Sequence, residues 1–177
     1  MVFTELMSEK YPGFQRLFTD GSRSGGSNTR VGVGMVVPSH KYTAKWKLHP
    51  DHSILTAELY GLLQALLYLQ RTKTNQRAVI WTDSLSSLHL LTSNRTSYYS
   101  SLVQDIHKII LSFPVGAVQL QWIPAHSEIR GNELGDTAAK EAAKDNLPVT
   151  EIPFSYSEGR TIITNKIWEF FTGIIYS

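Results

Sequence analysis

Four acidic residues carry most of the chemical information in this chain: Asp20, Glu58, Asp83 and Asp136. Asp20 and Asp83 each follow an apolar run, and each stands after a threonine and before a small residue. Glu58 lies near the start of a leucine-striped segment, and Asp136 follows a Gly-Asn-Glu turn. Four carboxylates that met at one point would repel one another unless a divalent cation bound between them. Oxygen ligands of this kind are typical of Mg²⁺ or Mn²⁺ sites and not of Zn²⁺ sites.

Hydrophobic periodicity predicts the elements that must position these carboxylates. Residues 14–19, 31–37 and 42–48 read as three strands of an antiparallel meander, because their apolar residues form short runs or alternate. A helix of about 18 residues follows, capped by Ser53 or Thr56. Its apolar face consists of leucines at spacings of four and three, namely Leu55, Leu59, Leu62, Leu66 and Leu69.

The second half of the chain alternates predicted strands and helices. Strands are expected at 78–82 and 117–123, and helices at 84–91, 98–112 and 131–144. This order predicts an α/β fold with a five-stranded mixed sheet, three strands antiparallel and two parallel, flanked by helices. The leucine-striped helix is long enough for a right-handed crossover that makes the fourth strand parallel to the first. Asp20 and Asp83 would then lie side by side at the carboxyl ends of neighbouring strands, where open α/β sheets place their sites.

Length and composition bound the kind of protein. The 177 residues fit one domain with tails, and we divide them into a lead-in (1–13), a domain (14–146), and a linker with a truncated C-terminal segment (147–177). No apolar stretch approaches the roughly 20 residues of a membrane span, so no membrane partner is expected. The chain has no cysteine, which favours an intracellular location, in the cytoplasm or the nucleus. The net charge is only +2, so global charge does not indicate a nucleic-acid binder.

Four motifs, in their order along the chain, resemble the type 1 ribonuclease H domain over roughly residues 14–145. They are Thr19-Asp20-Gly21-Ser22, Thr56-Ala57-Glu58-Leu59, Trp81-Thr82-Asp83-Ser84, and Ile123-Pro124-Ala125-His126 leading into Arg130-Gly131-Asn132-Glu133-Leu134-Gly135-Asp136. Each motif alone is a weak signal, but the ordered set is specific. Two details are most similar to the ribonuclease H domain of non-LTR retrotransposon polyproteins, namely Ile54-Leu55-Thr56-Ala57-Glu58 and Ile129-Arg130-Gly131-Asn132-Glu133.

The resemblance implies a ribonuclease H-like fold and a metal-dependent endoribonuclease that hydrolyses the RNA strand of RNA–DNA hybrids. It implies two Mg²⁺ ions, for which Mn²⁺ can substitute, held by Asp20, Glu58, Asp83 and Asp136. His126 would join these four as a catalytic residue that helps protons or products to move. The implied substrate contacts are Gly21, Ser22 and Asn132. The implied partners are the hybrid and a linked reverse transcriptase in a parent polyprotein, and the domain is expected to be a monomer.

The chain departs from many cellular members of this family at two places that concern substrate binding. Ile54-Leu55 stands where those members carry an Asn-Gln pair that contacts the minor groove of the hybrid. The basic protrusion of those members is also missing, and Arg95 and Lys108 are the basic residues of the corresponding interval. We therefore expect the chain alone to bind a hybrid weakly.

Structural explanations compete with the catalytic one at individual positions. Asp20 could be a turn or cap residue, Glu58 a partner of the helix dipole, and Asp136 an ion-pair partner of Lys140. His126 could be a loop residue without a role.

Two other functions also fit the fold. A catalytically silent hybrid-binding module from a decayed retroelement is disfavoured by the complete carboxylate set, and an integrase- or resolvase-like nuclease by the His126 loop with its Gly-Asn-Glu sequence.

Overall fold

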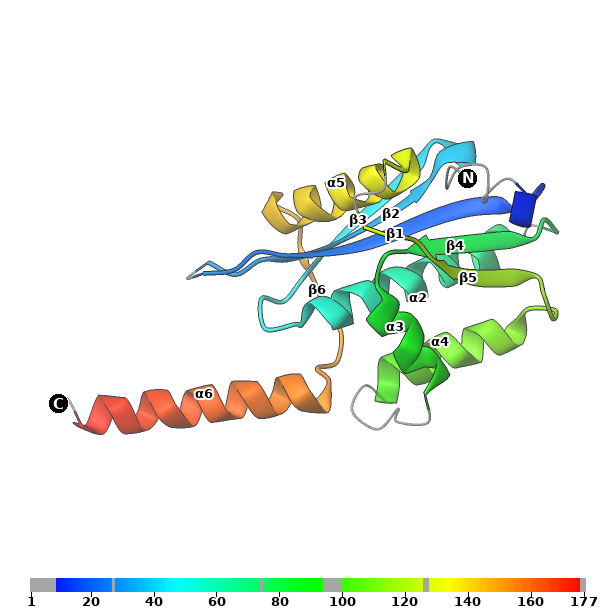
Figure 1. Cartoon of the computed structure of the whole chain (residues 1–177). Coiled ribbons are helices and arrows are strands. Elements are labelled where there is room, and N and C mark those ends of the chain that lie inside the picture. Colours follow the sequence, from blue (N-terminus) through cyan, green and yellow to red (C-terminus); the bar gives the residue numbers. More distant parts are fainter. Residues whose placement is uncertain (1–8, 27, 74, 94–99, 126–127, 176–177) are drawn as a thin grey trace.

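The computed structural model describes residues 9–26, 28–73, 75–93, 100–125 and 128–175. In this part of the chain, one sheet has the strand order β5-β4-β1-β2-β3-β6 (Figure 1). The strands are β1 (Gln15–Arg23), β2 (Val31–Val37), β3 (Tyr42–Leu48), β4 (Ala78–Thr82), β5 (Val118–Trp122) and β6 (Val149–Thr150). The helices are the 3-10 helix η1 (Pro38–His40), α2 (Ile54–Thr72), α3 (Leu85–Thr92), α4 (Ser100–Ser112), α5 (Arg130–Lys144) and α6 (Tyr156–Ile175).

The predicted α/β class and mixed sheet are confirmed, with six strands instead of five among the described residues. β1, β2 and β3 form the expected antiparallel meander. β4 is parallel to β1, and β5 is parallel to β4. The additional strand β6 pairs in parallel with β3, Val149 opposite Lys47 and Thr150 opposite Leu48. A strand of two residues has no alternation, so the sequence pattern did not indicate it.

β1 is longer than the sequence predicted, and this places Asp20 inside the strand. Its last residues, Gly21 to Arg23, pair with β2 as one arm of the β1–β2 hairpin. The parallel pairing with β4 ends earlier, at Phe18 opposite Trp81. Asp20 therefore lies in a continuous strand but beyond the last residue that β4 covers, which leaves its side chain next to the carboxyl end of β4.

The two faces of the sheet carry different helices. α2 packs on one face against β1, β2 and β4 and contacts α3 and α4, while α5 lies on the opposite face over β1, β2 and β3 (Figure 1). Four leucines of the α2 stripe are buried in the main core, as predicted, and the fifth, Leu55, packs against it partly buried. Ser53 is the N-cap of α2, and its Oγ accepts a hydrogen bond from the amide of Thr56 at 3.1 Å. Of the two predicted cap residues, the structure therefore uses Ser53.

Small residues allow α5 to lie very close to the sheet. A Cβ atom added to Gly34 would stand 2.4 Å from the carbonyl oxygen of Gly135, and one added to Gly32 would stand 2.2 Å from that of Ala139. No side chain fits at either position without moving the helix. The alternation of β2, with valines and Met35 toward α2 and glycines toward α5, therefore determines how near Asp136 on α5 comes to β1.

The C-terminal helix α6 projects away from the rest of the molecule after its first turn (Figure 1). Several of its large apolar side chains are exposed, including Ile163, Ile167, Trp168, Phe170 and Phe171. Within the described residues, no helix is both long and apolar enough to cross a membrane.

Candidate active site

Three carboxylates from three different elements meet at one point of the structure. Asp20 comes from β1, Glu58 from α2, and Asp83 follows β4 directly. One ligand oxygen from each of the three lies within 4.8 Å of the others. Asp20 and Glu58 are each only 6% exposed, and Asp83 is half-buried. The arrangement results from the parallel pairing of β1 and β4 and from the crossover helix α2 that joins the meander to β4.

Gly21 holds Glu58 in this cluster. The Gly21 amide donates a hydrogen bond to Glu58 Oε1 at 3.1 Å. A Cβ atom at Gly21 would stand 3.1 Å from the Ala57 Cβ and 3.2 Å from the Glu58 Cδ, so α2 approaches β1 closely here. The second oxygen, Glu58 Oε2, is buried and has no hydrogen-bond partner among the described residues. Glu58 therefore points toward β1 and keeps an oxygen unpaired in the cluster, which does not fit the role of a dipole partner.

The electrostatics of the cluster are unfavourable without a cation. Burial, followed by the negative charges of Asp83 and Asp136, raises the pKa of Asp20 from 3.8 to about 7. Burial, followed by Asp20 and Asp83, also raises the pKa of Glu58 well above its ordinary value. The Gly21 amide opposes both shifts. Each carboxyl thus makes ionisation of the next more costly.

Asp136 reaches the same site from α5. A cavity of about 210 Å³ is lined by Asp20, Gly21, Asp83, Ile129, Asn132, Glu133 and Asp136. The negative charge of Asp136 is one of the causes that raise the pKa of Asp20, and a Cβ atom added to the neighbouring Gly135 would stand 3.7 Å from the Asp20 Cβ. The Asp136 carboxylate also forms an ion pair with Lys140 Nζ at 2.7 Å. The alternative role considered for Asp136, an ion-pair partner of Lys140, is therefore present together with its position at the cavity. The structure thus brings all four predicted carboxylates to one cavity or its edge.

Of the three predicted substrate contacts, Gly21 and Asn132 line this cavity. Asn132 is 5% exposed, lines the cavity, and its Oδ1 has no hydrogen-bond partner within the described part of the chain. Ser22 follows Gly21 on β1 opposite Gly32 and is half-buried. Their contact with a substrate stays a prediction, as does that of Gly21. His126 lies outside the described residues.

Trp122 is a residue of this region that the sequence did not single out. It ends β5, and its indole Nε1 donates a hydrogen bond to the backbone carbonyl of Asp83 at 3.1 Å. The Ser84 amide donates to Thr82 Oγ1 at 3.1 Å, on the other side of the same residue. These two contacts restrain the backbone that carries the Asp83 carboxylate. A tryptophan at the end of a short strand gave no periodic signal for this role.

Comparison with known proteins now identifies the family. The sequence model of the RNase H family matches residues 15–144, a range that contains the four carboxylates. The chain belongs to the RNase H family. The resemblance seen in the four motifs is thereby confirmed, while the narrower likeness to retrotransposon domains stays a prediction.

Individual relatives of this RNase H chain are distant. Ribonuclease H1 of Mus musculus is 26% identical over 144 residues, which cover 73% of this chain and 50% of the relative. Ribonuclease H1 of Homo sapiens is 25% identical over 147 residues, which cover 75% and 51%. The chain thus spans about half the length of the curated relatives that it matches.

Solved structures support the fold. A foamy viral protease-reverse transcriptase in complex with dsDNA superposes with a TM-score of 0.58 at 17% identity, covering 75% of this chain and 95% of that chain. Native prototype foamy virus protease-reverse transcriptase gives a TM-score of 0.61 at 17% identity, covering 77% of this chain and 22% of that chain. At this identity the likeness establishes an RNase H-like fold.

RNase H proteins generally use divalent metals, and the residues of this site fit such an ion. The donor set consists of carboxylate oxygens, the ligands that hard cations prefer. Glu58 Oε2 is buried without a partner, and a buried acceptor left unpaired is costly. The raised pKa of Asp20 has the charges of Asp83 and Asp136 among its causes, and a bound cation would offset those charges.

Proposed function

We propose that this chain is a metal-dependent endoribonuclease that hydrolyses the RNA strand of RNA–DNA hybrids. The observation that carries the proposal is the cluster of Asp20, Glu58 and Asp83, two buried carboxylates and one half-buried carboxylate with ligand oxygens within 4.8 Å of one another. Membership of the RNase H family supports the choice of substrate and reaction. Asp136 would complete the metal site from the other side of the cavity.

These four residues would hold two divalent cations, Mg²⁺ or Mn²⁺. When bound, such ions lower the pKa of a water molecule, which makes it a nucleophile at neutral pH, and they supply positive charge that stabilises the leaving oxygen. The contribution of the chain itself is to hold the carboxylates in position. Gly21 directs Glu58 toward Asp20, and Trp122 restrains the backbone of Asp83. Both residues hold the carboxylates in place before a substrate arrives, which lowers the cost of reaching the reactive geometry.

Asn132 is the best-placed residue to recognise the RNA strand. Its Oδ1 is a buried acceptor without a partner within the described residues, in the wall of the carboxylate cavity. A 2′-hydroxyl can donate a hydrogen bond, and a deoxyribose cannot, so an acceptor at this place would distinguish RNA from DNA. This supports the predicted role of Asn132 as a substrate contact. His126 would assist turnover without holding a metal.

Weak intrinsic binding is also part of the proposal. Phosphate contacts from lysine and arginine supply most of the non-specific affinity for nucleic acids. A net charge of +2 leaves few lysines and arginines in excess for such contacts, and the apolar Ile54-Leu55 pair cannot form polar contacts with the hybrid. A reverse transcriptase domain linked to this chain would offset the deficit by raising the effective concentration of the hybrid. We propose that the domain acts as a monomer within such a polyprotein.

One assay tests the proposal. The purified chain is incubated with a labelled RNA–DNA hybrid, with single-stranded RNA and with duplex DNA, in Mg²⁺ and in EDTA, and Asp83→Asn serves as the inactive control. We expect Mg²⁺-dependent cleavage of the RNA in the hybrid, leaving 5′-phosphate and 3′-hydroxyl ends. Cleavage that persists in EDTA or prefers duplex DNA would contradict the proposal. Hybrid binding without cleavage would instead support a catalytically silent binding module.

A further inference from the structure

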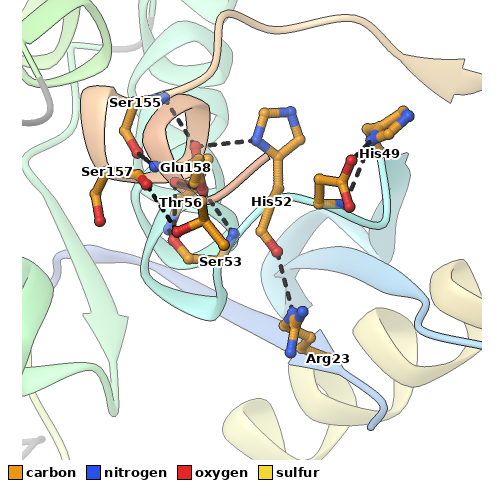
Figure 2. A network of polar contacts seen from close by, with 10 residues as sticks. Arg23, His49, His52, Ser53, Thr56, Ser155, Ser157 and Glu158 are labelled. Carbon is orange, nitrogen blue, oxygen red and sulfur yellow. Dashed lines mark hydrogen bonds and ion pairs between the residues drawn. The ribbon is translucent and has the colours of Figure 1, made fainter. Parts of the chain in front are cut away.

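Glu158 on α6 is a buried carboxylate outside the active-site cluster, and it contacts four residues. Its side chain is 5% exposed and lies between the first turn of α6 and the N-terminus of α2 (Figure 2). Oε1 accepts hydrogen bonds from the Ser53 amide and from Thr56 Oγ1, both at 2.6 Å. Oε2 accepts from the Ser155 amide at 2.8 Å and lies 3.3 Å from His52 Nδ1.

On its own helix, Glu158 completes a capping box. Ser155 precedes α6, and its Oγ accepts a hydrogen bond from the Glu158 amide at 3.2 Å. Glu158 Oε2 in turn accepts from the Ser155 amide. This reciprocal pair, in the sequence Ser-Tyr-Ser-Glu, satisfies two amides that a helix start otherwise leaves unpaired.

The same carboxylate supplies the missing half of a capping box on α2. Ser53 caps α2 in the usual way, but the position where a capping box needs Glu or Gln is occupied by Thr56. The first turn of α2 contains no acidic residue. Glu158 Oε1 accepts the hydrogen bond from the Ser53 amide that a glutamate at position 56 of α2 would otherwise accept. Its negative charge lies at the positive end of the α2 dipole.

The environment of Glu158 keeps it ionised. Burial by itself raises the pKa of the Glu158 carboxyl, but the hydrogen bonds from His52, Ser53, Thr56 and Ser155 outweigh burial and lower the pKa below its ordinary value. The His52 ring, 1% exposed, also packs on Phe154 with ring centroids 4.4 Å apart. The His52 carbonyl accepts a hydrogen bond from Arg23 Nε at 3.2 Å, which ties the same turn to the end of β1 (Figure 2).

The turn that Glu158 completes leads directly into the active site. Thr56 and Ala57 are the residues just before Glu58, and both are buried. The Ala57 amide makes the first hydrogen bond of the turn, to the Ser53 carbonyl at 3.1 Å. The Ala57 Cβ and the Glu58 amide nitrogen would each lie 3.1 Å from a Cβ atom added to Gly21. A turn that frayed here would move Glu58 away from the Gly21 amide that orients it.

We propose that Glu158 is a positioning residue of the active site, which completes the N-terminal cap of α2 and thereby holds Glu58 in place. The inference rests on the proposed function of the carboxylate cluster. It adds residues 149–158 to the working unit, although the family match ends at residue 144. β6 attaches this segment to the edge of the sheet, and Glu158 attaches it to α2. In this chain a residue outside the family match supports a carboxylate inside it.

The test compares Glu158→Gln with Glu169→Gln, an identical change at an exposed position of the same helix. Mn²⁺ affinity is measured by calorimetry without nucleic acid, amide exchange is followed over residues 53–58, and hybrid cleavage is measured with Mg²⁺. We expect Glu158→Gln to weaken Mn²⁺ binding about tenfold, the usual effect of losing a contact that orients a metal ligand. Exchange over 53–58 should accelerate and kcat should fall with KM unchanged, while the control matches the parent.

Each outcome has a defined meaning. A Glu158→Gln protein that melts earlier but keeps parental Mn²⁺ affinity and exchange would overturn the proposal and leave Glu158 as an anchor of α6 only. If Glu158→Gln does not fold, Thr56→Val, which removes a single one of the Glu158 contacts, undergoes the same comparison. A parent protein that binds Mn²⁺ but does not cleave a hybrid would refute the proposed function alone, because the metal and exchange measurements use no substrate.

Discussion

Replacing Asp20 by asparagine should stabilise the metal-free protein while abolishing its activity. The Asp20 side chain is 6% exposed and faces Glu58, Asp83 and Asp136. Asparagine has nearly the same shape but cannot ionise. The substitution therefore removes a buried charge from a site where burial and neighbouring carboxylates already oppose ionisation. Loss of activity with a gain in stability is the expected behaviour of a residue retained for function.

The magnitude follows from the pKa shift. Burial and the charges of Asp83 and Asp136 raise the pKa of Asp20 from 3.8 to about 7. Between these values the folded protein holds a proton that the unfolded chain has released, so the free energy of unfolding decreases as pH rises through this window. Three pKa units at about 1.4 kcal/mol each give a cost of at most about 4 kcal/mol, fully present at pH 8. For a chain of this size the corresponding gain in Tm is on the order of 10 °C.

Urea unfolding in EDTA measures this difference. The parent and Asp20→Asn are compared at pH 8 and at pH 5, with Asp105→Asn as the control. Asp105 is an exposed carboxylate on α4, 3.5 Å from Lys108, and such pairs contribute little. We expect Asp20→Asn to be more stable than the parent at pH 8, and we expect the difference to shrink at pH 5, where the parent's Asp20 is already protonated. Mg²⁺ should stabilise the parent more than the variant.

Two results would refute this reasoning. An Asp20→Asn protein no more stable than its parent at pH 8 would mean that repulsion among the carboxylates is relieved without a cation. A gain that is equal at both pH values, or is matched by Asp105→Asn, would show that the titration of Asp20 is not its source.

Three further predictions concern the site and its support. Asp83→Asn should reduce hybrid cleavage by more than about a hundredfold without changing the circular dichroism spectrum, and near-parental cleavage by a folded variant would make Asp83 a structural residue. His126→Ala should slow turnover but leave the Mg²⁺ dependence unchanged, whereas a loss as complete as that of Asp83→Asn would place His126 among the essential groups. Gly34→Ala should lower the free energy of unfolding by about 1–3 kcal/mol, because its Cβ would meet the Gly135 carbonyl at 2.4 Å, and unaltered urea unfolding would disprove that close contact.

The sequence alone determined the main helices and strands and their order along the chain. The leucine spacing defined α2, because helix periodicity is a local property that neighbouring residues show directly. The parallel pairing of β1 and β4 followed from the length of the crossover and its handedness. These two inferences were enough to place Asp20 beside Asp83, and the Thr-Asp motifs made the same prediction through family resemblance.

Only the tertiary structure decided the contacts that join distant parts of the chain. The partners of Glu158 on α2 are more than 100 residues away, so no local pattern connects them. Its own capping box, Ser155 to Glu158, is a local signal in the sequence that marks the start of α6 at Tyr156. The two-residue strand β6 was not readable, since its existence depends on the free edge of β3.

The glycines of β2 show the same division. Alternation predicted that one face of β2 is apolar, and the sequence shows where its glycines stand. That Gly32 and Gly34 receive the backbone of α5, and thereby bring Asp136 against Asp20, depends on how two surfaces fit together. The electrostatics of the site were likewise decided by the tertiary structure, because the pKa of a carboxyl depends on its burial and on charges from other elements. Local pattern specified which residues could act, and packing decided which of them meet.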